Sequence, residues 1–295
     1  MKKIVLSVLL SGSLLSVFSQ KNHDKKVGAH LYDSDTTIID DEDNIYEVEN
    51  LGSKINSRHI ESGPRISPDG KSLYFFRVDH PKNYSHTRDI WVSHYDDADS
   101  TWGEAEHLKV PLNNYGDNSV HSISPDGQTL LLHNVYLKNG LTKNGVSLSN
   151  WNESKEKWSF PEEIKIKGYK NDQTCSFYLC NDMKTMILAI HSKDSFGEQD
   201  LYVSFKDEKG KWSKPLNMGA TLNTQYSEAT AFMSSDGETL YYSSNGVPSG
   251  SQGLGGYDIY RTSRLDSTWT NWSTPENMGS PWNTSDDEFY FSIPE

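Results

Sequence analysis

The sequence has little of what would indicate a familiar chemistry. Only two cysteines occur, Cys175 and Cys180. Their spacing of five along one predicted strand would put them roughly 16 Å apart and on opposite faces, so we expect free thiols and no disulfide. After the first residues, no segment approaches the ~18 consecutive apolar residues of a membrane-spanning helix. We therefore expect a protein that does not span a membrane.

Basic residues and catalytic motifs are also scarce. The formal net charge is −13, which disfavours nucleic acid and anionic lipid as partners. The sequence contains no Gly-x-Ser-x-Gly, no His-Glu-x-x-His and no paired cysteine and histidine signature. The glycine-rich stretch 250–256 does not predict phosphate binding, because a strand follows it and supplies no helix N-terminus. We expect no cofactor, no metal and no catalytic residue set.

The two ends of the chain differ from its body. Residues 1–19 begin with two lysines before a short apolar run that ends in small residues, which is typical of a secretory signal peptide. Residues 20–45 form a polar, acidic leader, and residues 46–295 are long enough for one all-β domain. We expect an exported protein, located in the periplasm, associated with the outer membrane, or secreted.

A repeat organises the body of the chain. Turn aspartates recur at Asp69, Asp126, Asp182 and Asp236, in steps of 57, 56 and 54 residues. Each lies in a Ser-Pro-Asp-Gly-like turn between two apolar strands, and a third strand and a tryptophan follow. The tryptophan is expected to start a short fourth strand. Four antiparallel strands per unit, with no helical period, predict the blades of a β-propeller, whereas a sandwich would not need the same turn at a fixed spacing.

The repeats predict about five blades: four full repeats and a closing or truncated one. The stretch 288–294 matches the first strand of a further unit, and 46–52 resembles the last strand of a unit. Two interpretations stay open. Either the C-terminal strand closes the ring with N-terminal strands, or the natural protein continues beyond this chain.

Several motifs recur in order and resemble a known family. Ser-Pro-Asp-Gly-Lys-Ser-Leu-Tyr-Phe at 67–75, Trp-Ser-Lys-Pro-Leu-Asn-Met-Gly-Ala-Thr-Leu-Asn-Thr at 212–224 and Gly-Gly-Tyr-Asp-Ile-Tyr at 255–260 are similar to TolB-type, WD-like propeller repeats of bacterial envelope proteins. The resemblance implies a protein-interaction platform. In that family the propeller often precedes an outer-membrane-protein-A-like domain, and these residues include no peptidoglycan-binding segment. Two positions depart from the pattern, since Met183 replaces a turn glycine and Gly145 replaces a third-strand aspartate.

Equivalent first-strand positions are the candidate channel site. Counting back eight residues from each turn aspartate, with the matching C-terminal residue added, gives Glu61, Asn118, Thr174, Glu228 and Glu288. Their carboxylates could hold a cation or a polyhydroxylated ligand, or they could bond neighbouring backbone amides and set the blade spacing. Arg65 and His121 lie further along the same strands and could mark a functional side, although Arg65 could equally neutralise the carboxylates. The repeated Asp89, Asp200 and Asp258 are expected to cap loop backbone.

The loop 77–86 is the first candidate for a partner-binding rim, through Asp79, His80, Tyr84 and His86. We expect a monomeric, non-enzymatic binding or scaffold propeller that mediates protein–protein interaction with an envelope protein or a glycan. The alternative is a carbohydrate-active propeller that binds or cleaves glycans with the channel carboxylates Glu61 and Glu228.

Overall fold

A computed structural model describes residues 50–170, 175–247 and 253–293 in full. For residues 1–49 it describes only the backbone of short strands, which form a sheet in the order β1-β2-β5-β4-β3. The strands of this sheet are β1 (Lys3–Ile4), β2 (Leu15–Gln20), β3 (Leu31–Tyr32), β4 (Thr36–Asp41) and β5 (Asn44–Asn50). The predicted signal peptide and leader therefore lie outside the fully described residues and stay predictions.

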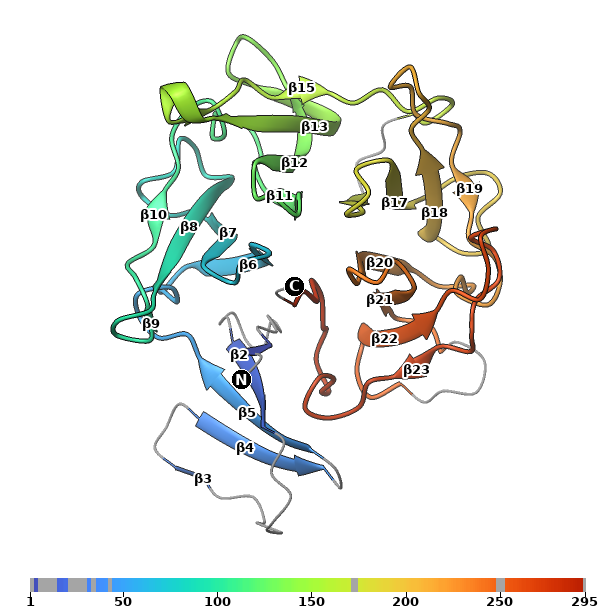
Figure 1. Cartoon of the computed structure of the whole chain (residues 1–295), viewed down its shortest axis with the longest axis horizontal. Coiled ribbons are helices and arrows are strands. Elements are labelled where there is room, and N and C mark those ends of the chain that lie inside the picture. Colours follow the sequence, from blue (N-terminus) through green and yellow to red (C-terminus); the bar gives the residue numbers. More distant parts are fainter. Residues whose placement is uncertain are drawn as a thin grey trace.

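Four antiparallel sheets follow one another around a ring, so the predicted β-propeller is confirmed (Figure 1). The first two blades each carry a small extra strand. Blade one contains β6 (Ile60–Ile66), β7 (Ser72–Val78), β8 (Arg88–Asp96), β9 (Thr101–Trp102) and β10 (Glu106–His107). Blade two contains β11 (Val120–Ile123), β12 (Thr129–Tyr136), β13 (Thr142–Asn152), the 3₁₀ turn η1 (Glu153–Lys155), β14 (Lys157–Trp158) and β15 (Glu162–Glu163).

The third and fourth blades have four strands each. Blade three contains β16 (Ser176–Leu179), β17 (Thr185–Ile190), β18 (Asp200–Phe205) and β19 (Leu216–Asn217). Blade four contains β20 (Glu228–Met233), β21 (Thr239–Ser244), β22 (Asp258–Ser263) and β23 (Glu276–Asn277). The expectation that the repeated tryptophans start the fourth strands is wrong. Each tryptophan pairs back onto the end of the third strand. The fourth strands begin further along, at Glu106, Glu162, Leu216 and Glu276.

The predicted turns close each inner hairpin. In blade one the Gly70 amide donates to the Ser67 carbonyl at 2.8 Å, while the Lys71 amide donates to the Asp69 carboxylate at 3.0 Å. Glycine occupies the last turn position at φ 72 (Gly70), 70 (Gly127) and 67 (Gly237). Met183 takes φ 56 at the equivalent position of blade three, which confirms that this turn holds a side chain in the left-handed region.

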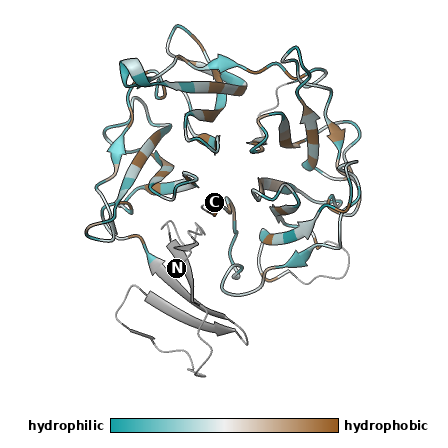
Figure 2. Cartoon of the chain, viewed as in Figure 1, coloured by the Kyte–Doolittle hydropathy of each residue, from teal (hydrophilic) through white to brown (hydrophobic). Residues whose placement is uncertain are grey.

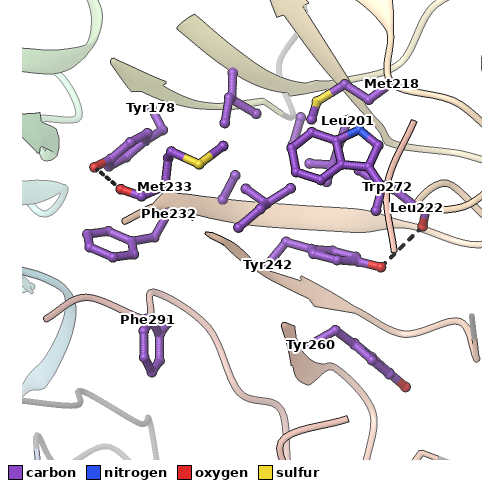
Figure 3. Packing of buried hydrophobic residues seen from close by; sticks show 14 of the residues in the cluster. Tyr178, Leu201, Met218, Leu222, Phe232, Met233, Tyr242, Tyr260, Trp272 and Phe291 are labelled. Carbon is purple, nitrogen blue, oxygen red and sulfur yellow. Dashed lines mark hydrogen bonds between the residues drawn. The ribbon is translucent and has the colours of Figure 1, made fainter. Parts of the chain in front are cut away.

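The core lies between neighbouring blades, where each sheet buries both faces (Figure 2). In Figure 3, aromatic side chains of blades three and four interdigitate between the sheets. Tyr178 donates its hydroxyl hydrogen to the Met233 carbonyl of the neighbouring blade at 3.0 Å, so polar contacts also hold the inner strands together. Trp91, Trp212 and Trp272 are buried in such layers, whereas Trp102 and Trp158 are half-buried.

The C-terminal segment 288–293 lies beside β20, where an inner strand of a fifth blade would be (Figure 1). The Tyr290 amide donates to the Thr230 hydroxyl at 3.2 Å, as the Thr230 amide donates to the Ser176 hydroxyl at 3.2 Å. Phe291 packs in the same aromatic layer as Phe232. The residues 50–293 thus include four complete blades and one further inner segment.

Candidate functional site

Three predicted channel carboxylates are buried at the joints, by which we mean the segments that lead from one blade into the first strand of the next. Glu228 accepts hydrogen bonds from the Thr224 amide at 3.1 Å and hydroxyl at 2.8 Å, and its side chain has no exposed surface. Glu61 accepts equivalent bonds from the Ser57 amide at 3.1 Å and hydroxyl at 2.5 Å. Glu288 accepts from the Thr284 hydroxyl at 2.5 Å. Each carboxylate therefore bonds to the Ser or Thr that lies four residues earlier in the chain, and so fixes the loop between them.

The other two members of the set behave differently. Asn118 replaces the carboxylate in blade two and accepts a hydrogen bond from the Asn114 amide at 2.9 Å. Its side-chain NH₂ donates to the Asn114 side-chain carbonyl at 3.1 Å. Thr174 lies outside the described residues. The described members thus do not form an open ring of oxygens, and their predicted part in ligand or ion binding stays a prediction.

Donors from the second strand complete two of these carboxylate sites. Arg77 in β7 donates from Nε to Glu61 at 2.9 Å, and Ser244 in β21 donates to Glu228 at 2.9 Å. Burial raises the pKa of Glu228 to about 7, and it also raises the pKa of Glu288. In the part of the chain that is described, Glu288 Oε2 has no hydrogen-bond partner.

The side chains that meet at the centre lie four residues further along the same strands. A cavity of about 30 Å³ is lined by residues from every inner strand and from the C-terminal segment, and each contributes the residue at this equivalent position. These five residues are Arg65, Ser122, Tyr178, Phe232 and Ser292. A volume of this size holds about one water molecule or one small ion. Pro68 and Asn181, which belong to the hairpin turns, place the cavity at the turn side of the ring.

A β-bulge explains why Arg65 and Phe232 face the centre. The pairing of β6 with β7 shifts between Ser62 and Arg65, and that of β20 with β21 shifts between Ala229 and Phe232. At the bulge Gly63 has φ 61 and Thr230 has φ 35, and Tyr290 has φ 65 at the same position of the C-terminal segment. Because a bulge changes the phase of the strand, the residues after it point in another direction than simple alternation predicts.

Arg65 does not neutralise the joint carboxylates. Its Nε donates to the His121 carbonyl at 2.5 Å, its Nη1 donates to the Pro64 carbonyl at 2.9 Å, and its guanidinium lies 5.2 Å from the centre of the Tyr290 ring. Arg77 is the residue that pairs with Glu61, at 2.9 Å. Burial lowers the pKa of Arg65 to about 10, so it is still a cation at neutral pH.

His121 lies beside Arg65 and contacts a second histidine. The His121 Nε2 and His133 Nδ1 atoms are 3.3 Å apart, and the ring of Phe177 packs on the other side. Burial lowers the pKa of both imidazoles, to about 4 for His133. The pair is neutral at physiological pH, so it cannot supply a second positive charge to the centre.

The predicted rim loop divides into exposed and packed residues. His86 and Asp79 lie 3.2 Å apart at the surface, where the His86 side chain is fully exposed. His80 packs edge-on against Trp91, with ring centres 4.4 Å apart, and burial lowers its pKa to about 4. Tyr84 lies 6.0 Å from the Tyr115 ring of the neighbouring joint. His86 and Asp79 are therefore the more accessible pair of this loop.

The third-strand aspartates cap loop backbone, as predicted. Asp200 accepts from the Phe196 amide at 2.8 Å and the Gly197 amide at 3.2 Å, and Asp258 accepts from the Leu254 amide at 2.6 Å and the Gly255 amide at 3.1 Å. Asp89 accepts from the Tyr84 amide at 2.9 Å. Residues 254 and 255 of the glycine-rich stretch are thus anchored to the third strand.

A repeated asparagine, which the sequence analysis did not single out, ties three of the joints to the preceding blade. The Asn223 side chain accepts from the Leu201 amide at 2.7 Å and donates to the Leu201 carbonyl at 3.0 Å. Asn113 and Asn283 bridge Ile90 and Ile259 in the same way. The signal was present as a recurring apolar residue and asparagine in the stretches 112–113, 222–223 and 282–283.

In the stretches 50–170, 175–247 and 253–293, no three His, Cys, Asp or Glu side chains are grouped so that they could hold a metal ion. The only helix within the same stretches is the short turn η1, and none is long and apolar enough to cross a membrane.

Comparison with known proteins gives similarity to propellers of several kinds. No protein-family profile and no curated protein sequence matches the chain. Among solved structures, TolB from Acinetobacter baumannii is 18% identical over 77% of this chain and 46% of its own length, with a TM-score of 0.44. A putative TolB from Agrobacterium tumefaciens is 16% identical over 79% of this chain and 65% of its own length, with a TM-score of 0.43. The chain therefore spans less than two thirds of either protein.

An enzyme appears at a similar level of likeness. The α-L-arabinofuranosidase of Lactobacillus brevis is 12% identical over 73% of this chain and 73% of its own length, with a TM-score of 0.41. Binding proteins and hydrolases share this fold, so the likeness does not separate a binding role from an enzymatic one.

Proposed function

We propose that this protein is a non-enzymatic binding module of the cell envelope or secreted fraction that holds a protein partner on one face of its ring. The observation that carries the proposal is that exposed apolar side chains from every blade lie in or beside the loops of that face. In an antiparallel blade, the start of the first strand, the end of the second and the start of the third lie at one edge. Loops at these points therefore share one face, which we call the rim face.

In the described part of the chain twelve large hydrophobic residues are exposed, and seven of them lie in or beside loops of the rim face. They are Ile60, Tyr115, Leu141, Phe196, Tyr226, Val247 and Leu254. Hydrogen bonds connect the loops that carry them, from the Tyr115 amide to the Gly140 carbonyl at 2.9 Å and from the Glu198 amide to the Tyr226 carbonyl at 2.9 Å. Exposed apolar groups that are held in place and surrounded by polar residues are typical of protein-binding surfaces.

The candidate catalytic carboxylates support the same proposal. A glycosidase needs a general acid and a second carboxylate that both reach the sugar. Glu61 and Glu228 have no exposed surface and bond to their own loops and second strands. The expected export of the chain, from the predicted signal peptide at 1–19, would bring the rim face to envelope proteins or glycans.

The test compares two sets of surface variants on the full chain. Tyr115→Ser, Phe196→Ser and Tyr226→Ser would be combined to remove apolar area from the rim face. Phe160→Ser and Leu265→Ser would remove exposed apolar residues elsewhere and serve as the control. The immobilised proteins would be used to recover partners from an envelope extract, and each candidate would then be titrated in purified form.

We expect a protein that the wild type and the control variant bind and that the rim variant binds at least tenfold more weakly. Equal binding by all three chains would overturn the rim proposal. Cleavage of an aryl-glycoside panel that is lost in Glu61→Gln or Glu228→Gln would establish the carbohydrate-active alternative.

A further inference from the structure

The central cavity carries an inference that is independent of the rim face. It lies on the turn side of the ring, where Pro68 and Asn181 border it, and the rim face is at the opposite edge of the blades. Its volume of about 30 Å³ is formed by all four inner strands and the C-terminal segment. The cavity is therefore a feature of the assembled ring and not of one blade.

Arg65 brings an uncompensated positive charge to this cavity. The residue is only 5% exposed, and its guanidinium contacts the carbonyls of His121 and Pro64 and the ring of Tyr290. None of the Asp or Glu residues in the described stretches forms an ion pair with it. A buried charge without a counter-charge is unfavourable, and an anion in the cavity would relieve that penalty.

Two hydroxyl groups add donors to the same cavity. Ser122 accepts a hydrogen bond from the Leu179 amide at 3.1 Å, and its own hydrogen is left to donate. Ser292 is 4% exposed and lines the cavity from the C-terminal segment. Phe232 and Ile66 supply apolar walls that lower the local dielectric and strengthen charge interactions. A cationic donor and two hydroxyls in an apolar wall are suited to a negative ligand.

We propose that this cavity binds one small monovalent anion, with Arg65 as the charge and Ser122 and Ser292 as hydrogen-bond donors. The volume suits a halide ion or the tip of a carboxylate, because it accommodates about one water-sized group. The net charge of −13 works against the approach of anions, so the binding depends on these local donors.

The experiment follows the ³⁵Cl resonance of sodium chloride in the presence of the full chain, since bound chloride broadens the line. Sodium acetate is then added to test whether a carboxylate displaces chloride, and sodium isethionate, which has no carboxylate, keeps the ionic strength constant. Arg65→Met removes the charge. Arg261→Met is the matched control, because Arg261 is exposed and pairs with Glu276 at 2.7 Å on the surface.

We expect saturable broadening with the wild type and Arg261→Met and none with Arg65→Met. Displacement by acetate identifies a carboxylate as the ligand group, and failure of acetate to compete identifies a free halide. Should Arg65→Met not fold, Ser292→Ala serves in its place, with binding roughly tenfold weaker for the loss of one bond to a charged ligand. Equal broadening by the wild type and the folded cavity variant would overturn the proposal.

Discussion

Arg77 donates a hydrogen bond to Glu61 at 2.9 Å, and both side chains are almost completely buried. The pair joins the second strand of blade one to the loop that precedes the blade, because Glu61 also bonds Ser57. Arg77 further stacks 4.2 Å from the centre of the Trp91 ring and donates to the Ile55 carbonyl at 2.6 Å. The blade and the preceding segment are thus fastened at one buried ion pair.

Loss of Arg77 should therefore destabilise the fold strongly. We expect Arg77→Met to lower the free energy of unfolding by ~3–5 kcal/mol, because it leaves the Glu61 carboxylate buried without its counter-charge. Ser244→Ala, at the equivalent position of blade four, should lower it by ~1–3 kcal/mol, since a neutral donor is lost. Urea denaturation measures both values. The double variant Arg77→Met with Glu61→Gln should be more stable than Arg77→Met alone, and a further loss would contradict this explanation.

Glu228 should make stability depend on pH. Burial raises its pKa from 4.5 to about 7, with a smaller contribution from the nearby Asp200. The folded protein then holds this proton more tightly than the unfolded chain does. The resulting stabilisation is complete below about pH 4.5 and is lost as the pH rises through about 7, by roughly 3 kcal/mol.

Glu228→Gln is the variant that isolates this effect, because its neutral side chain does not titrate. Urea denaturation of both proteins between pH 4.5 and 8 should show the free energy of the wild type falling relative to that of the variant as the pH rises. A constant difference across this range would show that Glu228 ionises with an unshifted pKa.

The blade-three turn should respond to the choice of residue at Met183. Met183→Ala keeps a Cβ at φ 56, whereas Met183→Gly removes it, and both lose the same packing against the blade core. We expect the glycine variant to be more stable by ~1 kcal/mol. Gly127→Ala tests the same strain in reverse. A Cβ there would meet no atom within 4 Å, so any loss of stability would come from the backbone at φ 70 and not from a clash. Equal melting temperatures for Met183→Gly and Met183→Ala would exclude strain at this turn.

The architecture was readable from the sequence because its local signals agree. The turn at Ser67–Gly70, the aspartate at Asp200 and the tryptophan at Trp272 recur with fixed spacing, and each has a local hydrogen-bonding or packing reason. Even the departure at Met183 was predictable, since alignment with glycine turns requires a positive φ. These motifs are made of residues that are close in the sequence, so they can be recognised in a single sequence without the structure.

The candidate site could be predicted only in part from the sequence, because it depends on which face of the first strand each side chain takes. Alternation along the first strand suggests that Glu61 and Glu228 face the centre, but the bulge after them shifts the phase, and Arg65 and Phe232 line the cavity. The bulge has glycine in blade one and threonine in blade four, so no common residue marks it. Likewise, Tyr115 and Tyr226 come to lie on one face only once the ring has formed.

At Gly197 the backbones of two rim-face loops lie close together, so a side chain added there should both destabilise the fold and separate the loops. A Cβ at this position would lie 2.1 Å from the Tyr226 carbonyl oxygen and 2.6 Å from the Gln225 carbonyl carbon, both of which are backbone atoms that cannot move aside. We expect Gly197→Ala to cost ~1–3 kcal/mol of stability and to separate the loop of Phe196 from that of Tyr226. The Glu198 amide, which donates to the Tyr226 carbonyl at 2.9 Å, reports this locally by faster hydrogen exchange. Because Gly127→Ala alters a turn on the opposite side of its blade, it should leave the Glu198 amide protected. If Gly197→Ala exchanges that amide as slowly as the wild type does, the two loops are not held by their close approach, and the rim face is set by other contacts.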